Sequence, residues 1–141
     1  RQLQASNWKR MKGTRKKYMD LEEALGHIDL TMWLATFQDD TGSYYGFEHP
    51  EKSLAWKRES VQKLLERPGN QLATFDQCQF GLVSPSGKPM QKRTKFMTNL
   101  GPLFNALNGK FCDHSHEHEL IQGSENGVKR SAWAQTYPDG L

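Results

Sequence analysis

A seven-residue segment near the C-terminus constrains the fold of this chain more than any other feature. The segment, Cys112 to His118, holds one of the two cysteines and three of the five histidines. Thiolate sulfur and imidazole nitrogen are ligands of zinc, and four of them complete a structural zinc site. The other cysteine, Cys78, lies in the block Asp76–Gly81. If the two blocks meet in the fold, they form a site of the Cys₂His₂ type.

A straight strand cannot place these side chains around one ion. Six residues of extended chain span roughly 20 Å, whereas zinc ligands lie about 2.0–2.3 Å from the metal. Cys112 and His118 can therefore share an ion only if the segment turns, and Asp113 and Ser115 are residue types compatible with a turn. The predicted ligands are Cys78, Cys112, His116 and His118, with His114 as a substitute ligand or as a group that supports one.

Two other interpretations of this segment stay open. It is also compatible with a solvated polar loop between helices, with Cys78 as a small buried apolar residue. A disulfide between Cys78 and Cys112 is the third possibility, although no secretory signal or cysteine framework accompanies it. If the metal is present, four protein ligands close its coordination shell, which is typical of a structural site. The segment is then a clamp that ties the C-terminal tail to the sheet.

Composition and charge set the remaining limits. With 141 residues, of which 35% are hydrophobic, the chain is one domain or a large piece of one. No apolar run approaches the roughly 20 residues of a membrane span, which predicts a soluble chain. Seven basic residues precede the first acid, Asp20, and a second basic cluster covers residues 88–95. Such clusters suit phosphate backbones, or they form a solvated face.

The hydrophobic pattern predicts an α/β fold. An apolar stripe steps by four and three residues from Leu21 to Ala35 and predicts a helix. The further expected elements are strands over 43–47, 71–75 and 94–98 and helices over 54–65, 102–109 and 128–135. This alternation favours a partial Rossmann-like sheet with flanking helices and a Cys/His-rich C-terminal extension. The predicted regions are a basic N-terminal arm (1–17), an α/β half domain (18–111) and the Cys/His-rich segment (112–141).

Polar side chains at predicted strand ends are candidates for a binding site, because open α/β sheets bind ligands at the carboxyl ends of their strands. Glu48 and Asp76 follow two of these strands, and a carboxylate such as Glu48 accepts hydrogen bonds from an exocyclic amine. Gln91, Arg93 and Lys95 share one face of an extended segment and can reach a phosphate or a carboxylate. The competing interpretations are an exposed acid and an edge strand protected by positive charge.

The order of these motifs resembles the second half of the catalytic domain of C5-cytosine DNA methyltransferases. In that family a strand ends in Glu-Asn-Val, whose glutamate binds the target cytosine, and a Gln-x-Arg-x-Arg segment follows. Glu48 matches the glutamate, His49-Pro50 stands in place of Asn-Val, and Gln91–Lys95 matches the basic segment with lysine for the last arginine.

A closer resemblance is to divergent methyltransferase-like open reading frames related to eukaryotic retrotransposons. It covers residues from about 44 to 138. The motifs are EHP at 48–50, Ala-Trp at 55–56 where Ser-Trp is usual, DQCQFG at 76–81, the segment 94–99, and Cys112 followed by His116-Glu117-His118. The opening residues 2–7 also resemble the stretch after the Pro-Pro-Cys motif of that group.

The resemblance implies a methyltransferase-like fold in which Glu48 and Arg93 have catalytic roles, Glu48 reading the base and Arg93 supporting the pocket, while Gln91 and Lys95 bind substrate. The methyl-donor glycine loop and the Pro-Pro-Cys nucleophile would both lie before Arg1. The chain alone is therefore expected not to methylate DNA, since covalent attack on cytosine needs an activated thiolate. S-adenosylmethionine is a cofactor only if that N-terminal half exists.

Two other functions stay open on the sequence. One is a non-enzymatic, zinc-stabilised module that binds nucleic acid or a protein through its basic surface. The other is a structural subunit of a larger assembly, with the N-terminal arm lying on a partner. An intracellular location is favoured, and the resemblance implies the nucleus.

Overall fold

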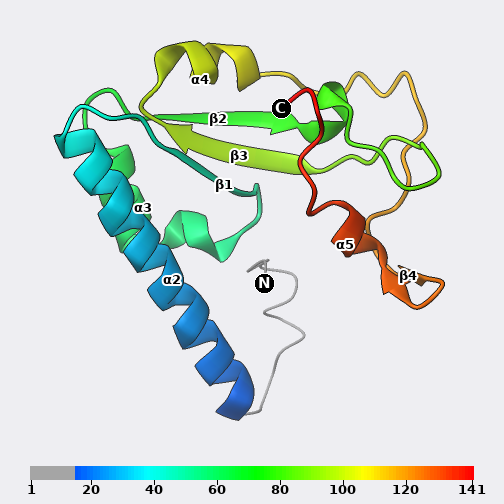
Figure 1. Cartoon of the computed structure of the whole chain (residues 1–141), viewed down its shortest axis with the longest axis horizontal. Coiled ribbons are helices and arrows are strands. Elements are labelled where there is room, and N and C mark those ends of the chain that lie inside the picture. The colour runs from blue at the N-terminus through cyan, green and yellow to red at the C-terminus, as the bar shows by residue number, and fades with distance from the viewer. Residues whose placement is uncertain (1–14) are drawn as a thin grey trace. The chain divides into compact units, whose positions relative to one another are not determined.

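The computed structural model describes residues 15–141, and their fold is mixed α/β (Figure 1). The first half holds the long helix α2 (Arg15–Asp40), strand β1 (Gly46–Pro50), the 3₁₀ turn η1 (Leu54–Lys57) and helix α3 (Glu59–Leu65). Then come β2 (Gln71–Asp76), the 3₁₀ turn η2 (Gln77–Phe80), β3 (Arg93–Thr98) and α4 (Gly101–Leu107). The chain ends with β4 (Ser124–Glu125), β5 (Val128–Lys129) and α5 (Arg130–Trp133).

Three strands form a sheet in the order β1-β3-β2. The hydroxyl of Thr98, the last residue of β3, donates to the carbonyl of Tyr45, just before β1. At the other strand pair, the N–H of Gln77, just after β2, donates to the carbonyl of Lys92, just before β3. The end of one strand thus meets the start of its neighbour, so β3 runs antiparallel to both β1 and β2, and Figure 1 shows the opposed arrows of β2 and β3.

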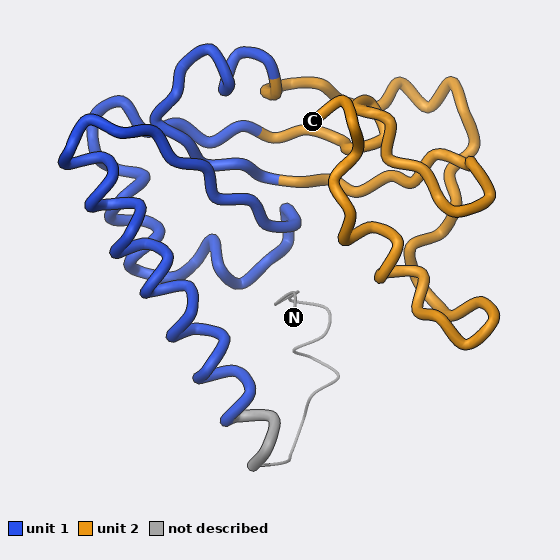
Figure 2. Tube along the Cα trace, in the orientation of Figure 1, with its two compact units in different colours: residues 1–73, 95–106 blue, residues 74–94, 107–141 orange. Residues whose placement is uncertain are grey.

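The described chain divides into two compact units (Figure 2). Unit 1 holds the described residues up to Ala73 together with Lys95–Ala106. Unit 2 holds Thr74–Thr94 and Leu107–Leu141. None of the helices described combines the length and apolar character needed to cross a bilayer. The predicted basic arm over 1–17 lies largely outside the described residues, since α2 already begins at Arg15.

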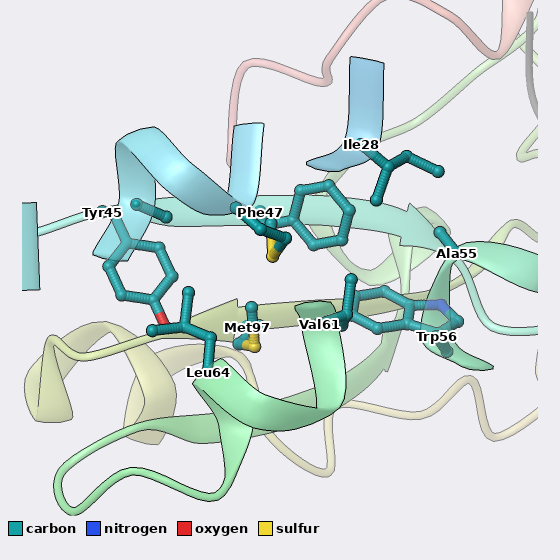
Figure 3. Close-up of a cluster of buried hydrophobic side chains, with 10 residues drawn as sticks. Ile28, Tyr45, Phe47, Ala55, Trp56, Val61, Leu64 and Met97 are labelled. Atoms are coloured by element: carbon teal, nitrogen blue, oxygen red, sulfur yellow. The ribbon is translucent and has the colours of Figure 1, made fainter. Parts of the chain in front are cut away.

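Unit 1 is built around one buried face of α2. The predicted stripe is present, and its members Ile28, Met32 and Ala35 are buried in one cluster with residues of the strands and of α3. Figure 3 shows Phe47 of β1 and Met97 of β3 in this cluster, beside the following side chains: Tyr45, Ala55, Trp56, Val61 and Leu64. Aromatic rings meet edge to face, with the Phe47 and Trp56 centroids 5.4 Å apart.

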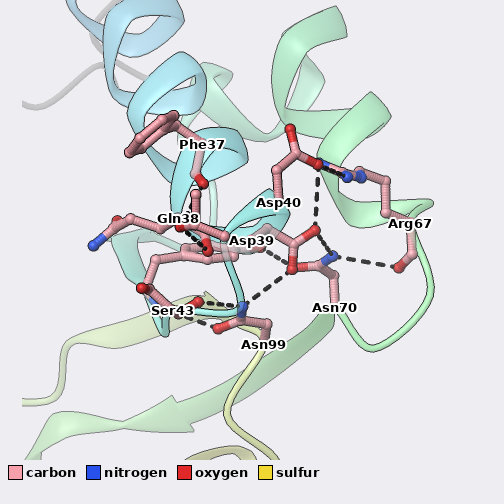
Figure 4. A network of polar contacts seen from close by, with 10 residues as sticks. Phe37, Gln38, Asp39, Asp40, Ser43, Arg67, Asn70 and Asn99 are labelled. Atoms are coloured by element: carbon pink, nitrogen blue, oxygen red, sulfur yellow. Dashed lines mark hydrogen bonds and ion pairs between the residues drawn. The ribbon is translucent and has the colours of Figure 1, made fainter.

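Polar contacts fix the end of α2 (Figure 4). Asn99 donates from its amide nitrogen to Asp39 Oδ1 at 3.1 Å and to the carbonyl of Ser43 at 2.9 Å. Arg67 forms ion pairs with Asp39, at 3.3 Å, and with Asp40. The helix therefore stops where its last two acidic residues are held by the segments that follow α3 and β3.

Unit 2 has buried apolar residues of its own. Leu82, Met90 and Ala134 form one cluster, with Ile121 and Trp133 packed against it, and Phe75, Leu107 and Cys112 are buried as well. The predicted helix over 128–135 is wrong in its first part, because Val128 and Lys129 form β5 and the helix spans only Arg130–Trp133. The cause is the turn at Asn126-Gly127, where both residues have positive φ, 49° and 78°. This pair is typical of a tight β-hairpin, and β4 pairs with β5 antiparallel.

Candidate metal centre

Cys78 is positioned by the tight turn that follows β2. The 3₁₀ turn η2 begins directly after Asp76 and ends at Gly81, whose φ of 88° lies in the left-handed region that favours glycine. The N–H of Gly81 donates to the carbonyl of Cys78 at 3.2 Å, and the N–H of Leu82 donates to the carbonyl of Gln77 at 3.2 Å. These bonds hold the half-buried Cys78 next to the end of the strand.

Cys112 reaches the same strand end from a different part of the sequence. After α4 the chain turns at Gly109 and runs beside β2, with the N–H of Asp76 donating to the carbonyl of Lys110 at 3.0 Å. The N–H of Cys112 then donates to Asp76 Oδ2 at 3.0 Å. This contact joins residues 36 positions apart and buries the Cys112 side chain.

The turn that the spacing requires follows immediately. Asp113 Oδ1 accepts a hydrogen bond from the N–H of Ser115 at 3.0 Å, and His114 adopts a φ of 60°. This turn brings His116 Nε2 to 3.5 Å and His118 Nε2 to 3.4 Å from Cys112 Sγ. The N–H of His114 also donates to this sulfur at 3.3 Å.

The structure brings together the four residues that the sequence pattern predicts as ligands. The Sγ atoms of Cys78 and Cys112 and one ring nitrogen each of His116 and His118 all lie within 4.8 Å of one another. In a tetrahedral zinc site with ordinary bond lengths, a sulfur and a nitrogen ligand are roughly 3.5 Å apart. The two sulfur–nitrogen distances from Cys112 already have this value. Both cysteines are free.

Electrostatics at this cluster favour a neutral imidazole and a protonated thiol when no cation is bound. Burial, and then the hydrogen bond to Cys112, raise the pKa of Cys78 to about 12. Burial and the neighbouring His116 and His114 lower the pKa of His118. A neutral imidazole is the form that binds a metal, and a bound cation deprotonates a coordinating thiol. The donor set thus fits Zn²⁺, and four protein ligands leave no open position for substrate.

A buried carboxylate supports the loop that begins at Cys112. Asp76 has a fully buried side chain that accepts two hydrogen bonds from Arg93, at 3.0 and 2.9 Å, one from Gln91 at 3.3 Å, and the one from the Cys112 N–H. Burial alone would raise the pKa of Asp76, but the bonds from Arg93, Cys112 and Gln91 outweigh it and lower the pKa. The guanidinium of Arg93 also lies over the ring of Phe111, 4.9 Å from its centroid.

The other residues predicted for a substrate site lie in different places. Gln91 and Arg93 belong to unit 2, where they bind Asp76, whereas Glu48 and Lys95 belong to unit 1. Glu48 lies inside β1 and is half-buried, because the strand starts at Gly46 and continues to Pro50. Lys95 lines a pocket of ≈ 470 Å³ in unit 1, together with Lys52 and Lys57. Glu48 is not among the residues that line this pocket.

The sequence did not predict that Asp76 accepts hydrogen bonds from Gln91, Arg93 and the N–H of Cys112. The pattern indicated that Gln91 and Arg93 could reach a carboxylate, but not that the carboxylate belongs to this chain. A signal was present, since Asp76 precedes a predicted ligand by two positions at a strand end. Comparisons of the chain with family models, with curated proteins and with solved structures gave no match.

Proposed function

We propose that this chain is a zinc-stabilised module, in which Cys78, Cys112, His116 and His118 bind one structural Zn²⁺ ion. The observation that carries the proposal is the convergence of the four ligand atoms within 4.8 Å. They come from two segments far apart in the sequence, η2 and the loop that follows Cys112. A metal between η2 and the loop after Cys112 would close unit 2, as structural zinc does in small domains.

The experiment measures metal content and metal-dependent stability together. The purified chain should hold close to one zinc ion, and chelation should lower its thermal midpoint. Replacement by Co²⁺ should give the visible absorption of a tetrahedral site with thiolate ligands. Cys112→Ser and His118→Ala should lose the metal, because each removes one of four ligands. His114→Asn is the matched control and should keep it, since His114 is not in the ligand group and asparagine tolerates its φ of 60°. A chain without metal, with both thiols free in solution, refutes the proposal.

A second proposal is that the chain forms the base-binding half of a C5-cytosine methyltransferase-like domain with a partial Rossmann-like sheet. What supports it is the α/β character of the fold, in which β1 and β2 run in the same direction on either side of an antiparallel β3; antiparallel strands also occur within larger α/β sheets. Glu48, which matches the base-binding glutamate of that family, lies in β1. Base-binding enzymes read a flipped base through hydrogen bonds to its edge. The chain should then bind DNA with an unpaired cytosine more tightly than DNA with an unpaired thymine. Glu48→Gln should abolish this preference, and equal binding of both DNAs by the natural chain contradicts the proposal.

The alternative within the zinc-module proposal is nucleic-acid binding without base recognition. It is favoured by the three lysines around the pocket of unit 1, none of which pairs with a carboxylate within residues 19–141. Binding to phosphates releases counterions, so the affinity for duplex DNA should fall steeply between low and moderate salt. Lys52→Ala/Lys57→Ala should weaken binding and reduce this salt dependence, whereas an affinity that ignores salt would exclude phosphate binding.

A further inference from the structure

Helix α2 carries a second apolar face that nothing in the described chain covers. Leu30, Trp33 and Phe37 follow one another by three and four residues, so they lie on one side of the helix. The exposed fractions along this stripe are 57% for Leu30, 64% for Trp33, 49% for Leu34 and 59% for Phe37. The rings of Trp33 and Phe37 stack with centroids 6.4 Å apart. The buried residues of α2, such as Met32, lie on the opposite side.

A glycine lies within the helix on this same exposed face. Gly26 precedes Leu30 by four residues, and a Cβ added at Gly26 would meet nothing within 4 Å. Glycine in the middle of a helix is unfavourable relative to alanine. Since no neighbour within residues 15–141 requires its small size, the close approach of a partner would explain why a glycine occupies this position.

We propose that the outer face of α2 binds the same face of a second copy of this chain in an antiparallel helix pair. The spacing from Gly26 to Phe37 follows the alternating four and three residues of a coiled-coil seam. In an antiparallel pair centred between Leu30 and Trp33, Phe37 of one copy faces Gly26 of the other, and Trp33 faces Leu30. Each large side chain then meets a smaller one, and two-fold symmetry repeats the match.

The exposed area is sufficient for a weak dimer. Two aromatic side chains and two leucines exposed to this degree present on the order of 450 Å² per copy, since buried aromatic residues each contribute about 150–250 Å². Two copies would bury on the order of 900 Å². This total lies close to the roughly 1,000 Å² at which specific interfaces begin. An interface near this threshold is typical of a weak, concentration-dependent dimer.

Sedimentation velocity of the zinc-loaded, reduced chain from about 5 to 500 µM tests the proposal, with reducing agent present so that Cys78 and Cys112 form no crosslink. The chain should pass from monomer to dimer over this range. Trp33→Lys/Phe37→Lys should stay monomeric throughout with unchanged helix content. Val128→Lys adds the same kind of charge at an exposed apolar residue of unit 2 and should dimerise like the natural chain.

Substitutions of Gly26 separate an interface from a purely structural role. Gly26→Ala should raise the thermal midpoint of the dilute chain by about 2–4 °C, because alanine favours the helix, and should at the same time weaken dimerisation. Gly26→Leu should weaken dimerisation at least tenfold. A chain that stays monomeric at 500 µM overturns the proposal, and so does a dimer that forms equally well with Gly26→Leu or with Trp33→Lys/Phe37→Lys.

Discussion

Two ion pairs with the same hydrogen-bond pattern differ in burial and allow its effect to be measured within one chain. Asp76 accepts hydrogen bonds from Nε and Nη2 of Arg93. Asp29 accepts hydrogen bonds from the same two nitrogens of Arg58. The side chain of Asp76 is 0% exposed, whereas that of Asp29 is 39% exposed. Asp76→Ala should therefore destabilise unit 2 strongly, and Asp29→Ala should destabilise unit 1 only slightly.

The size of the Asp76 effect follows from its partners. The substitution leaves the buried N–H of Cys112 without its acceptor, which costs about 1–3 kcal/mol. It also removes the charge-assisted bonds of Arg93, whose side chain is 41% exposed and can rehydrate in part. The sum should be about 3–4 kcal/mol, near the lower end for breaking a buried ion pair. Because Asp76 orients a metal ligand through that N–H, zinc affinity should fall about 10–100-fold. The exposed ion pair between Asp29 and Arg58 should contribute much less to the free energy of unfolding, as surface ion pairs do.

Hydrogen exchange measured by mass spectrometry reports both units separately. In zinc-saturated protein, Asp76→Ala should lower the opening free energy of β2, β3 and the loop after Cys112. Asp29→Ala should change the opening of α2 and α3 only slightly. A zinc-competition titration gives the affinities, and Asp29→Ala serves as its matched control. If both substitutions cost the same free energy, or if Asp76→Ala leaves zinc affinity unchanged, the argument from burial and the Cys112 contact is wrong.

Two further predictions concern unit 1. The hydrogen bonds from Arg58 and then Ser60 lower the pKa of Asp29 from 3.8 to about 2. The stabilisation that Asp29 provides is complete above the unfolded pKa and is lost as the pH falls from about 4 to about 2. In metal-free melts over this range, Asp29→Asn should therefore lose stability less steeply than the natural chain, and an unchanged slope would contradict the assignment. At Gly46, an added Cβ would lie 2.5 Å from Phe96 Cζ. Gly46→Ala should cost about 1–3 kcal/mol in urea unfolding, and Phe96→Leu should restore most of it; a Gly46→Ala chain of natural stability would show that the ring moves aside freely.

Local patterns in the sequence predicted the elements that local forces determine. The stripe through Ile28 and Met32 has helical spacing, and the structure has a helix there with that side buried. The strand predicted over 71–75 corresponds to β2, and the one over 94–98 corresponds to β3. The turn between Cys112 and His116 followed from ligand geometry alone. These predictions needed no knowledge of distant contacts.

What the sequence did not predict depends on pairs of residues far apart or on competing local signals. The contact between Asp76 and Cys112 joins positions 36 residues apart, and no periodicity encodes it. At Asn126-Gly127 the hairpin signal was present, but the apolar residues that follow suggested a helix. The sequence did not predict the exposed apolar face of α2. A helix with apolar residues on two sides lacks the single apolar stripe by which a core-facing helix is recognised.

The arrangement in unit 2 explains why residues that resemble a substrate site serve a different purpose in this structure. Unit 2 contains long loops, and ordering them costs conformational entropy. Two sets of polar groups lie at the end of β2 and can offset this entropy cost. One is the Cys₂His₂ group, and the other is the Asp76 carboxylate with its four hydrogen bonds. Gln91 and Arg93 are committed to that carboxylate, so a ligand that recruited them would first have to displace Asp76 and loosen Cys112. A substrate site that needs Arg93 and the proposed metal centre would therefore compete for the same side chain, which in this structure binds Asp76.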